Sequence, residues 1–485
     1  MNTFKSKFRL YALFTLLAIT IFSCKDDEEV NPDEEEEEVI VSPNVAINNW
    51  ILDVMKEVYY WLDDMKTPIA NNSEPADYFE SLLFKPTDRF SAIYPNYQEL
   101  INNLSGVSTE AGYEFSLLRE SLDNQNVLAA VTYIKKGSPA DSGGLLRGDL
   151  LTQINGTTMT LSNYQSLLRS ISSNHTVTYR RFIEGSNTLG PGQTMNLSTI
   201  SIQENPNFLD TVYTFENQKI GYFIYNFFSP GVENSQGQMD TRYDQEMDEV
   251  FAKFKAEGVN HLVVDFRYNG GGYVTSSVNL ASMIAPDITS SSIFSKTKFN
   301  SFLSQFSQFQ NVQTNFKTKS QNIGNNLTEK TVYVITSRGT ASASELVINS
   351  LKPYMEVVII GDVTYGKNVG SVAFEDEDNP DNNYGLLPII TKSFNSLDQS
   401  DYGNGFIPDI EMNELDFLPF RNLGDINEPL LNSAIEKILN RPPSGRKSGI
   451  KRQFVGSSLD RKIRQGLLLE DPKSFRSAFE KINTH

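Results

Sequence analysis

Histidine and cysteine are scarce in this chain of 485 residues, which contains three histidines and one cysteine. The single cysteine, Cys24, cannot form a disulfide within the chain. Because the chain has so few histidines, a catalytic site built from serine, histidine and aspartate is nearly excluded. His175 and His261 lie in strand-like contexts without acidic or cysteine partners at ligand spacing. We therefore expect structural roles for both and predict no metal site.

Basic residues are also in short supply, with 42 Lys and Arg against 60 Asp and Glu and a formal net charge of −18. This balance disfavours nucleic acid as a partner, because phosphate binding needs clustered cations. The acidic cluster at residues 375–381 does not have the spacing of a calcium-binding loop and contains Pro380, which suits a solvated turn. No metal or organic cofactor is predicted.

The N-terminus combines basic residues with a short apolar stretch. Three basic residues precede residues 10–22, which are too few to span a bilayer comfortably. This pattern predicts an export signal over residues 1–23. Its end resembles a bacterial lipobox, which implies that Cys24 is lipidated and becomes the mature N-terminus. A plain secretory signal with an incidental cysteine is the alternative.

An acidic tether is expected between this signal and the first folded unit, over residues 24–43. Ten of the thirteen residues from 26 to 38 are acidic, and such a block repels itself and stays extended. Together with a lipidated Cys24, it predicts a protein of the cell envelope. We expect a lipid anchor, most simply in the outer membrane, with the folded part facing the periplasm or the cell surface.

The first folded unit is expected to be helical. Apolar residues recur at helical spacing between Asn48 and Met65, and a second short helix is expected at residues 78–83. These patterns predict a small helical N-terminal domain over residues 44–105.

Short strands and turns dominate residues 106–203. The segment carries, in this order, the motifs Gly137-Ser138-Pro139-Ala140, Gly148-Asp149 and Ile154-Asn155-Gly156. It resembles a PDZ domain of the type found in bacterial proteases. The resemblance implies that a peptide C-terminus adds to the sheet as a strand, with its carboxylate held by the loop made of Gly112, Tyr113, Glu114 and Phe115. A PDZ domain used only as a scaffold or lid is the alternative.

Strands alternate with helices from residue 210 to residue 420. Buried strands are expected at residues 261–266, 331–335 and 356–360, which argues for a sheet with crossover connections. A glycine loop, a serine turn and a lysine turn each follow one of these strands. Ligand sites in such sheets collect at the carboxyl ends of the strands, so the sequence predicts one site made from all three loops.

The serine turn and the lysine turn suggest a catalytic pair. Ser342 and Ser344 open a helix, and Lys367 follows the next strand. A hydroxyl is a weak nucleophile until a neighbouring base takes its proton. Lysine can be that base only when burial keeps its amine neutral. Spacing alone does not choose between the two serines, one of which could be a helix cap.

Four motifs in order carry a family resemblance. Residues 265–272, 341–345, 364–367 and 403–409, with a PDZ-like segment before them, resemble the C-terminal processing peptidases, a serine-lysine protease family known as peptidase family S41. The similarity runs from about Trp50 to Asp409.

The resemblance implies specific roles for residues at the three loops. Ser342 would be the nucleophile and Lys367 the general base. The oxyanion hole would use the backbone N–H of Ala343 and that of Gly270 or Gly271.

The chain departs from the family pattern at one position. Many members carry Gln or Glu four residues after the lysine, where it orients the base, whereas this chain has Ser371. Ser371 could take that role only at shorter reach, and Asn368 or a backbone carbonyl could serve instead.

These observations predict a mixed α/β protein. We expect a peptidase core with a crossover sheet over residues 210–420, a PDZ-like β-rich domain, a small helical N-terminal unit, and a C-terminal helix with an extension over residues 421–485. Residues 441–485 carry no readable motif and would form a mobile extension or a packing arm.

The expected function is that of an exported serine endopeptidase that docks substrate C-termini on its PDZ domain. The expected partners are peptide or protein substrates and a membrane, and the oligomeric state is not predicted. Two alternatives stay open. One is a peptide-binding protein on an inactive peptidase scaffold, and the other is a hydrolase of esters or cell-wall peptides.

Overall fold

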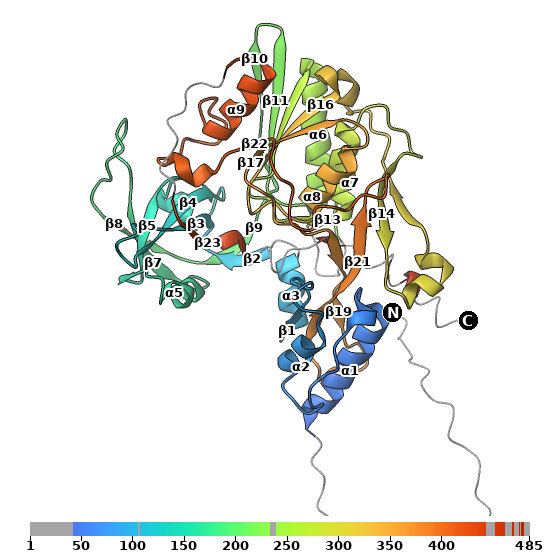
Figure 1. The fold of residues 1–485 in the computed structure, drawn as a ribbon. Helices are drawn as coiled ribbons and strands as arrows, with labels where there is room; N and C mark the ends of the chain where they lie inside the picture. The colour runs from blue at the N-terminus through green and yellow to red at the C-terminus, as the bar shows by residue number, and fades with distance from the viewer. Residues whose placement is uncertain are drawn as a thin grey trace, which may run out of the picture.

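The computed structural model describes residues 42–104, 107–232, 239–442, 452–460, 468–469, 475 and 477–479. The predicted signal over residues 1–23, Cys24 and almost all of the acidic tether lie outside these residues. Figure 1 shows three units: the N-terminal helices at the bottom, the PDZ domain at the left, and the α/β core above and to the right.

The core is built on a six-stranded sheet in the order β10-β11-β12-β16-β17-β22. All neighbouring strands are parallel except the β10-β11 hairpin. The strands are β10 (Asn207–Phe215), β11 (Gln218–Tyr225), β12 (His261–Asp265), β16 (Thr331–Thr336), β17 (Glu356–Gly361) and β22 (Ile410–Glu411). The expected crossover sheet and the three strands that precede the loops are therefore confirmed.

Apolar side chains alternate between the two faces of this sheet, as the pleat of a strand requires. On β12, Leu262 and Val264 pack under three helices, whereas Val263 packs under a fourth helix on the other face. The three helices of the first face are α6 (Arg242–Glu257), α7 (Val274–Ile284) and α8 (Ala343–Leu351), and α9 (Pro429–Ile438) covers the second face. Helix α6 is followed by Gly258, whose φ of 74° gives a left-handed cap.

A second sheet lies at the carboxyl ends of the parallel strands, with the order β13-β24-β18-β21-β14-β15. Its strands are β13 (Gly272–Tyr273), β14 (Ile293–Lys298), β15 (Val312–Asn315), β18 (Val369–Ser371), β21 (Ile389–Phe394) and β24 (Leu468–Leu469). Short 3-10 turns, η2 to η5 (Leu303–Gln305, Ser307–Phe309, Gly324–Asn326 and Thr328–Lys330), flank β15. The sequence did not predict this sheet, because several of its strands are short and pair with segments far away in the chain.

The PDZ domain forms a separate sheet in the order β23-β3-β4-β5-β7-β8. Its strands are β3 (Tyr113–Arg119), β4 (Val127–Ile134), β5 (Leu150–Ile154), β7 (His175–Arg180), β8 (Gln193–Leu197) and β23 (Phe454–Ser457), with helices α4 (Pro139–Gly143) and α5 (Tyr164–Ser170). The pair β5 and β6 (Thr157–Thr158) turns at Asn155 and Gly156, which form a two-residue hairpin loop. Strands β2 (Val107–Glu110) and β9 (Ile200–Gln203) pair beside this sheet.

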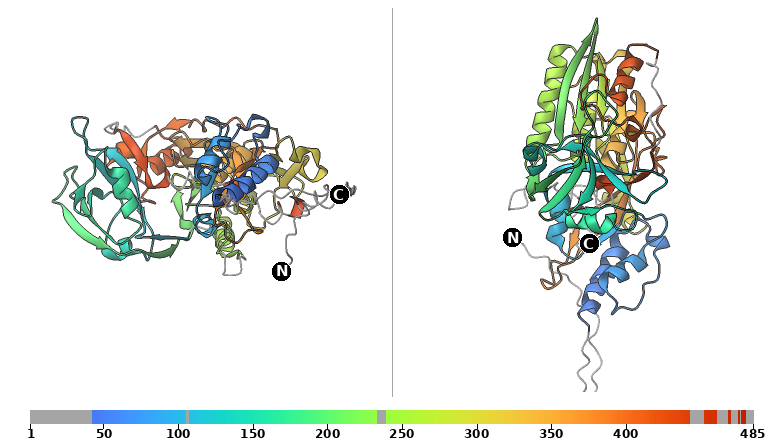
Figure 2. Two further views of the ribbon diagram at one scale, coloured as in Figure 1. Left: turned by 90° about the horizontal axis from the view of Figure 1, so that it is seen from below. Right: turned by 90° about the vertical axis from the view of Figure 1, so that its left-hand side faces the viewer.

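The N-terminal unit consists of helices packed against a small sheet from the core. Helices α1 (Pro43–Val58), α2 (Pro75–Leu82) and α3 (Tyr97–Leu104) and the turn η1 (Leu62–Asp64) make up the helical part. Strand β1 (Ala92–Tyr94) joins β20 (Gly385–Leu387) and β19 (Phe374–Glu375) of the core in a three-stranded sheet. The two further views in Figure 2 show these helices below the core and the PDZ domain to one side of it.

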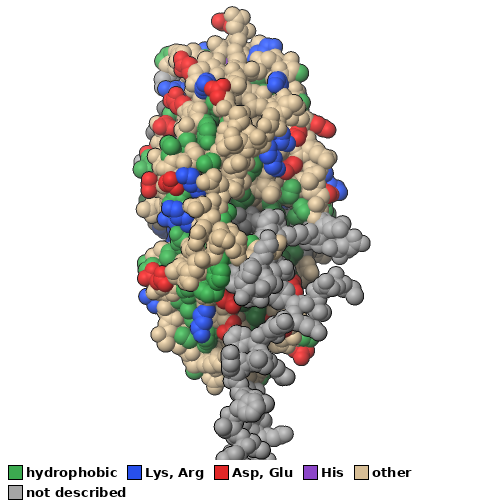
Figure 3. Space-filling view, turned by 90° about the vertical axis from the view of Figure 1, so that its right-hand side faces the viewer, with side chains coloured by type: hydrophobic (Ala, Val, Ile, Leu, Met, Phe, Trp, Pro, Cys, Tyr) green, Lys and Arg blue, Asp and Glu red, His purple; other side chains and the backbone are tan. Residues whose placement is uncertain are grey.

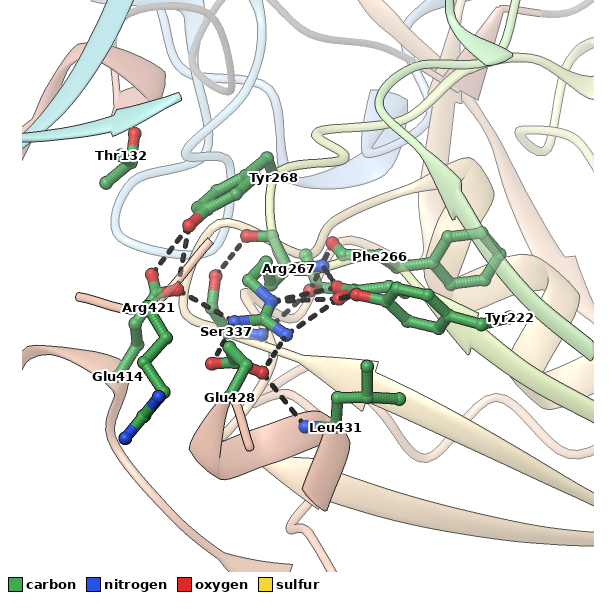
Figure 4. Close-up of polar contacts among 12 residues, drawn as sticks. Thr132, Tyr222, Phe266, Arg267, Tyr268, Ser337, Glu414, Arg421, Glu428 and Leu431 are labelled. Atoms are coloured by element: carbon green, nitrogen blue, oxygen red, sulfur yellow. Dashed lines mark hydrogen bonds and ion pairs between the residues drawn. The ribbon is translucent and has the colours of Figure 1, made fainter. Parts of the chain in front are cut away.

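A buried ion-pair network connects the PDZ domain to the core (Figure 4). The guanidinium of Arg267 contacts Asp265 at 2.7 Å, Glu428 at 2.9 Å and Glu414 at 2.8 Å. Arg147, from the PDZ domain, also contacts Glu414, at 2.5 Å. Burial would raise the pKa of Glu414, but the two arginines lower it to about 2. The carboxylate therefore stays ionised and holds the two units together at ordinary pH.

The surface carries mixed charge. On the face in Figure 3, acidic and basic side chains are interspersed rather than gathered by sign. Within the described residues, no helix has the length and apolar composition that crossing a membrane would require.

Candidate active site

The serine turn lies between β16 and α8, at the carboxyl end of a central strand. Ser342 is the residue before helix α8 and has φ 60° and ψ −113°, a strained conformation for a residue with a side chain. Its side chain is fully buried, and among the described residues its Oγ has no hydrogen-bond partner. The hydroxyl is thus buried and makes no hydrogen bond within the described residues, although Ser342 and Glu345 stand at the positions of a capping box.

Ser344, the other candidate, lies within the first turn of α8. Its Oγ donates a hydrogen bond of 3.1 Å to the carbonyl oxygen of Asn269, in the glycine loop. This bond gives Ser344 a structural role, because it ties the helix to the loop. The geometry thus separates two serines that spacing alone could not distinguish.

Lys367 lies in the loop between β17 and β18 and is fully buried. Burial lowers the pKa of its amine from 10.5 to about 7, while the nearby carboxylates of Asp88 and Glu345 act in the opposite direction. The ring of Phe90 lies against the amine, with its centroid 5.0 Å from Nζ. A lysine in this environment is partly neutral near pH 7 and can accept a proton.

Glu345 connects the serine turn to the lysine loop. Its Oε2 accepts hydrogen bonds from the backbone N–H of Ser342 at 2.9 Å and from that of Lys367 at 2.8 Å. Its Oε1 accepts bonds from the N–H of Gly366 at 2.7 Å and the hydroxyl of Thr364 at 2.6 Å. One buried carboxylate therefore fixes the backbone of both candidate residues. In the sequence, Glu345 stands out only as the last residue of the motif at residues 341–345.

The glycine loop covers the serine turn. A side chain on Gly271 would place its Cβ 2.6 Å from the Cβ of Ser342, and the φ of Gly271 is 112°, so only glycine fits. The N–H of Gly271 donates to the side-chain oxygen of Asn269 at 2.9 Å. The N–H groups of Gly270 and Ala343 make no hydrogen bond within the described residues. Of the two glycines that the resemblance allows, Gly270 thus has the available donor.

The third catalytic member that the sequence left open is not supplied by Ser371 through a hydrogen bond. Ser371 ends β18, and its buried Oγ has no hydrogen-bond partner among the described residues, so it does not bond to Lys367. The amide NH2 of Asn368 donates to the carbonyl oxygen of Ser400 at 2.8 Å. Lys367 is positioned instead by Glu345 and by residues of the N-terminal domain.

The N-terminal domain reaches the site through residues 86–91. The guanidinium of Arg89 donates to the carbonyl oxygens of Gly366, at 3.1 Å, and Gly403, at 3.3 Å. A pocket of about 470 Å³ lies between this loop and the lysine loop, lined in part by Trp61, Arg89 and Phe90. The aspartate, arginine and phenylalanine at positions 88–90 were visible in the sequence as a turn, but nothing in their spacing pointed to Lys367.

The predicted peptide-binding loop of the PDZ domain is buried. Glu114, whose charge would oppose a peptide carboxylate, lies 3.3 Å from the amine of Lys135. Burial would lower the pKa of Lys135, but Glu204, Glu114 and Glu110 raise it well above its usual value. The lysine is therefore charged and offsets the charge of Glu114.

The other residues of this loop are also engaged within the chain. A side chain on Gly112 would meet Ser138 at 2.1 Å, and the hydroxyl of Tyr113 contacts a ring nitrogen of His175 at 2.9 Å. The N–H of Phe115 donates to the hydroxyl of Ser458, from the C-terminal region, at 2.9 Å.

Comparison with known proteins identifies the family. The profile described as "Peptidase family S41" matches residues 219–412, "Peptidase S41 N-terminal domain" matches residues 46–92, and "PDZ domain" matches residues 130–181. The chain belongs to peptidase family S41.

Relatives of this S41 peptidase include two bacterial proteins with low sequence identity. The carboxyl-terminal-processing protease of Synechocystis is 22% identical over 330 residues, which span 67% of each chain. A CtpA-like serine protease of Staphylococcus aureus is 22% identical over 301 residues, which span 61% of this chain and 52% of that protein. The alignment thus covers about half the length of the staphylococcal relative.

A solved structure supports the fold of this S41 peptidase. A crystal structure assigned to an S41 protease of Bacteroides fragilis matches with a TM-score of 0.65 and 26% identity, covering 81% of this chain and 97% of that one. The resemblance inferred from the four sequence motifs is therefore confirmed at the level of the family, with its PDZ domain. Its catalytic roles rest on the geometry above.

We expect Glu345→Gln to disrupt both catalytic loops at once. Glutamine keeps the shape but offers one oxygen where the carboxylate accepts four hydrogen bonds, and each orphaned buried donor costs about 1–3 kcal/mol. Misplacement of Ser342 relative to Lys367 should slow labelling of Ser342 by a fluorophosphonate about 100-fold. Thermal unfolding and the labelling rate measure the two effects. Glu249→Gln, on the exposed face of α6, is the matched control. Unchanged labelling in Glu345→Gln would contradict the linking role.

The pH dependence of Ser342 labelling should follow the charge on Lys367. The neutral amine would be the base, and its fraction rises with pH through a pKa of about 7. Labelling should therefore fall about tenfold per pH unit below 7 and level off above it. The rate measured from pH 5 to 9 tests this. The profile should persist in Lys352→Met, which removes another lysine whose pKa burial lowers. A midpoint near 10 would show that Lys367 is not the base.

Proposed function

We propose that this chain is an endopeptidase that hydrolyses peptide bonds through a serine and a lysine. The observation that carries the proposal is the arrangement around Glu345. A strained serine with an unbonded hydroxyl and a buried lysine with a pKa of about 7 are held by one carboxylate. Such a pair meets the two needs of nucleophilic catalysis, which are a hydroxyl that is free to attack and a base that is neutral near the working pH.

The reaction would proceed by acyl transfer. The Oγ of Ser342 attacks the carbonyl carbon while Lys367 takes its proton, and the resulting oxyanion accepts hydrogen bonds from the N–H groups of Gly270 and Ala343. Ala343 is the first residue of α8, so the positive end of the helix dipole faces the oxyanion. Lys367 then gives its proton to the leaving amine, and water hydrolyses the acyl-enzyme in a second round of the same steps.

The substrate class that we propose is an extended peptide or protein segment, recruited in part through the PDZ domain. PDZ domains bind a peptide C-terminus as an added strand, and the domain here lies directly against the core, tied to it by Arg147 and Glu414. A substrate held on the PDZ edge would therefore be delivered close to the serine turn.

The alternative function is a peptide-binding protein that has lost catalysis. The observation that favours it is Ser371, which stands where many relatives carry an orienting Gln or Glu and makes no hydrogen bond to Lys367. Two observations oppose this alternative. The pKa of Lys367 is lowered, and the close approach of the serine turn to position 271 leaves room only for glycine. Hydrolysis of a peptide library separates the two functions.

We expect the two serines of α8 to respond differently to substitution. Ser342→Ala should abolish labelling by a fluorophosphonate and lower peptide hydrolysis by about 10³-fold or more. Ser344→Ala loses one buried hydrogen bond, so it should cost about 1 kcal/mol of stability and keep the label. Mass spectrometry of the labelled protein locates the modified residue. A label on Ser344, or hydrolysis that survives Ser342→Ala, would contradict the assignment.

We further propose that the protein is exported and anchored in the cell envelope by a lipid on Cys24. The basis is the sequence alone: an apolar signal followed by a cysteine and an acidic tether. In the native host, Cys24→Ser should move the protein from the membrane fraction to the soluble fraction and stop incorporation of a labelled fatty acid. Asn31→Ser, in the tether, is the matched control. Membrane association that is unchanged in Cys24→Ser would reject the anchor.

A further inference from the structure

The C-terminal region places a strand on the edge of the PDZ sheet. Strand β23 runs antiparallel to β3, with Phe454 opposite Leu118 and Ser457 opposite Ser116. The N–H of Arg119 donates to the carbonyl oxygen of Gln453 at 3.0 Å, so the pairing continues beyond the strand. Figure 1 shows β23 beside β3, although the two are more than 300 residues apart in the chain.

This edge is the one that a peptide would use. Strand β3 begins at the loop predicted to hold a peptide carboxylate, and the chain runs along it towards that loop. There the N–H of Phe115 donates to the Oγ of Ser458 at 2.9 Å, and that Oγ lies 3.2 Å from the carbonyl oxygen of Phe115. Val455 packs against the core cluster of the PDZ domain, as do Leu167 and Leu168 of α5. The segment therefore fills the place between a sheet edge and a helix where PDZ ligands add as strands.

The same segment then enters the interface between the PDZ domain and the core. Leu459 is buried and packs with Tyr133 of the PDZ domain and with Tyr268 and Ala341 of the core. Ala341 directly precedes Ser342. The chain thus passes from the PDZ edge to the immediate neighbourhood of the serine turn.

A second strand from this region lies at the catalytic loops. Strand β24 pairs in parallel with β13, where Gly272 faces Leu468 and Tyr273 faces Leu469, and with Ser371 of β18. Strand β13 follows the glycine loop, and β18 follows Lys367 by two residues. In the described part of the chain, β24 joins these two strands into one sheet. It occupies a strand position between the loop that supplies the oxyanion donor and the loop that supplies the base.

We propose that the PDZ edge and this strand position form one path for an extended peptide, and that the described residues 452–460 and 468–469, together the C-terminal segment, occupy it in place of a substrate. The proposal rests on the proposed function and deepens it. A substrate would be an extended segment that reaches both strand positions, with apolar side chains where Val455 and Leu459 now lie. It would bind only when the C-terminal segment leaves.

The segment competes strongly because it is tethered. A covalently linked ligand acts at an effective concentration in the millimolar range. If the segment binds its path with the micromolar affinity usual for short peptides, it should raise the apparent Kd of a free peptide at least about tenfold. If the C-terminal segment loses its anchoring contacts, the apparent Kd of the free peptide should fall by the same factor of about ten.

The test measures binding without catalysis. The probe is a fluorescent synthetic peptide with the sequence of residues 452–469, and the protein carries Ser342→Ala. The added double change Val455→Asp and Leu459→Asp should tighten probe binding at least about tenfold. Ile183→Asp, an exposed apolar residue of the PDZ domain, is the matched control and should leave the Kd unchanged. Equal affinity in all three proteins would overturn the proposal.

The double variant could misfold, so a second measurement uses the protein without the two Asp substitutions. In that protein, hydrogen exchange is followed with and without the probe. Excess probe should accelerate exchange in residues 452–460, and probe binding that leaves their protection intact would overturn the proposal. Peptide hydrolysis, measured in parallel with Ser342 present, separates the two ideas. If probe binding tightens but no protein hydrolyses peptides, the proposal that the C-terminal segment occupies the path stands and the proposed peptidase activity is rejected. Hydrolysis with no change in binding would keep the peptidase and reject the path.

Discussion

The site depends on one buried carboxylate. Glu345 accepts hydrogen bonds from the backbone N–H groups of Ser342 and Lys367, so the proposed nucleophile and the proposed base are positioned by the same group. A buried charge is tolerated only when it is fully hydrogen-bonded, and here four donors satisfy it. The same requirement fixes the strained backbone of Ser342, because relaxing that turn would withdraw a donor from Glu345.

A second buried network sets the position of the third loop. Arg267 and Asp265 pair at the start of the glycine loop, as part of a larger cluster with Glu428 and Glu414. Through Arg147 the cluster also reaches the PDZ domain. The glycine loop and the PDZ domain are therefore fixed by one set of charges, which holds the proposed oxyanion donor and the proposed peptide-binding domain next to each other.

Local pattern was enough to predict the elements that carry the site. The runs ending at Asp265, Thr336 and Gly361 are apolar and β-branched, so they read as buried strands, and parallel pairing brought the loops after them together. The functions of residues from other domains were not predictable in this way. Asp88 and Phe90 shape the environment of Lys367 from a loop more than 270 residues earlier, and no local spacing records that contact.

The sequence by itself determined the family, the order of the units and the three loops that meet at one edge of a sheet, because these follow from short motifs and hydrophobic periodicity. Only the tertiary structure decided which serine is unbonded, which glycine keeps its N–H available, how far burial lowers the pKa of Lys367, and that residues 454–457 and 468–469 add strands to the PDZ domain and to the catalytic loops. These properties arise from burial and from hydrogen bonds between segments distant in the chain, which a one-dimensional pattern does not contain.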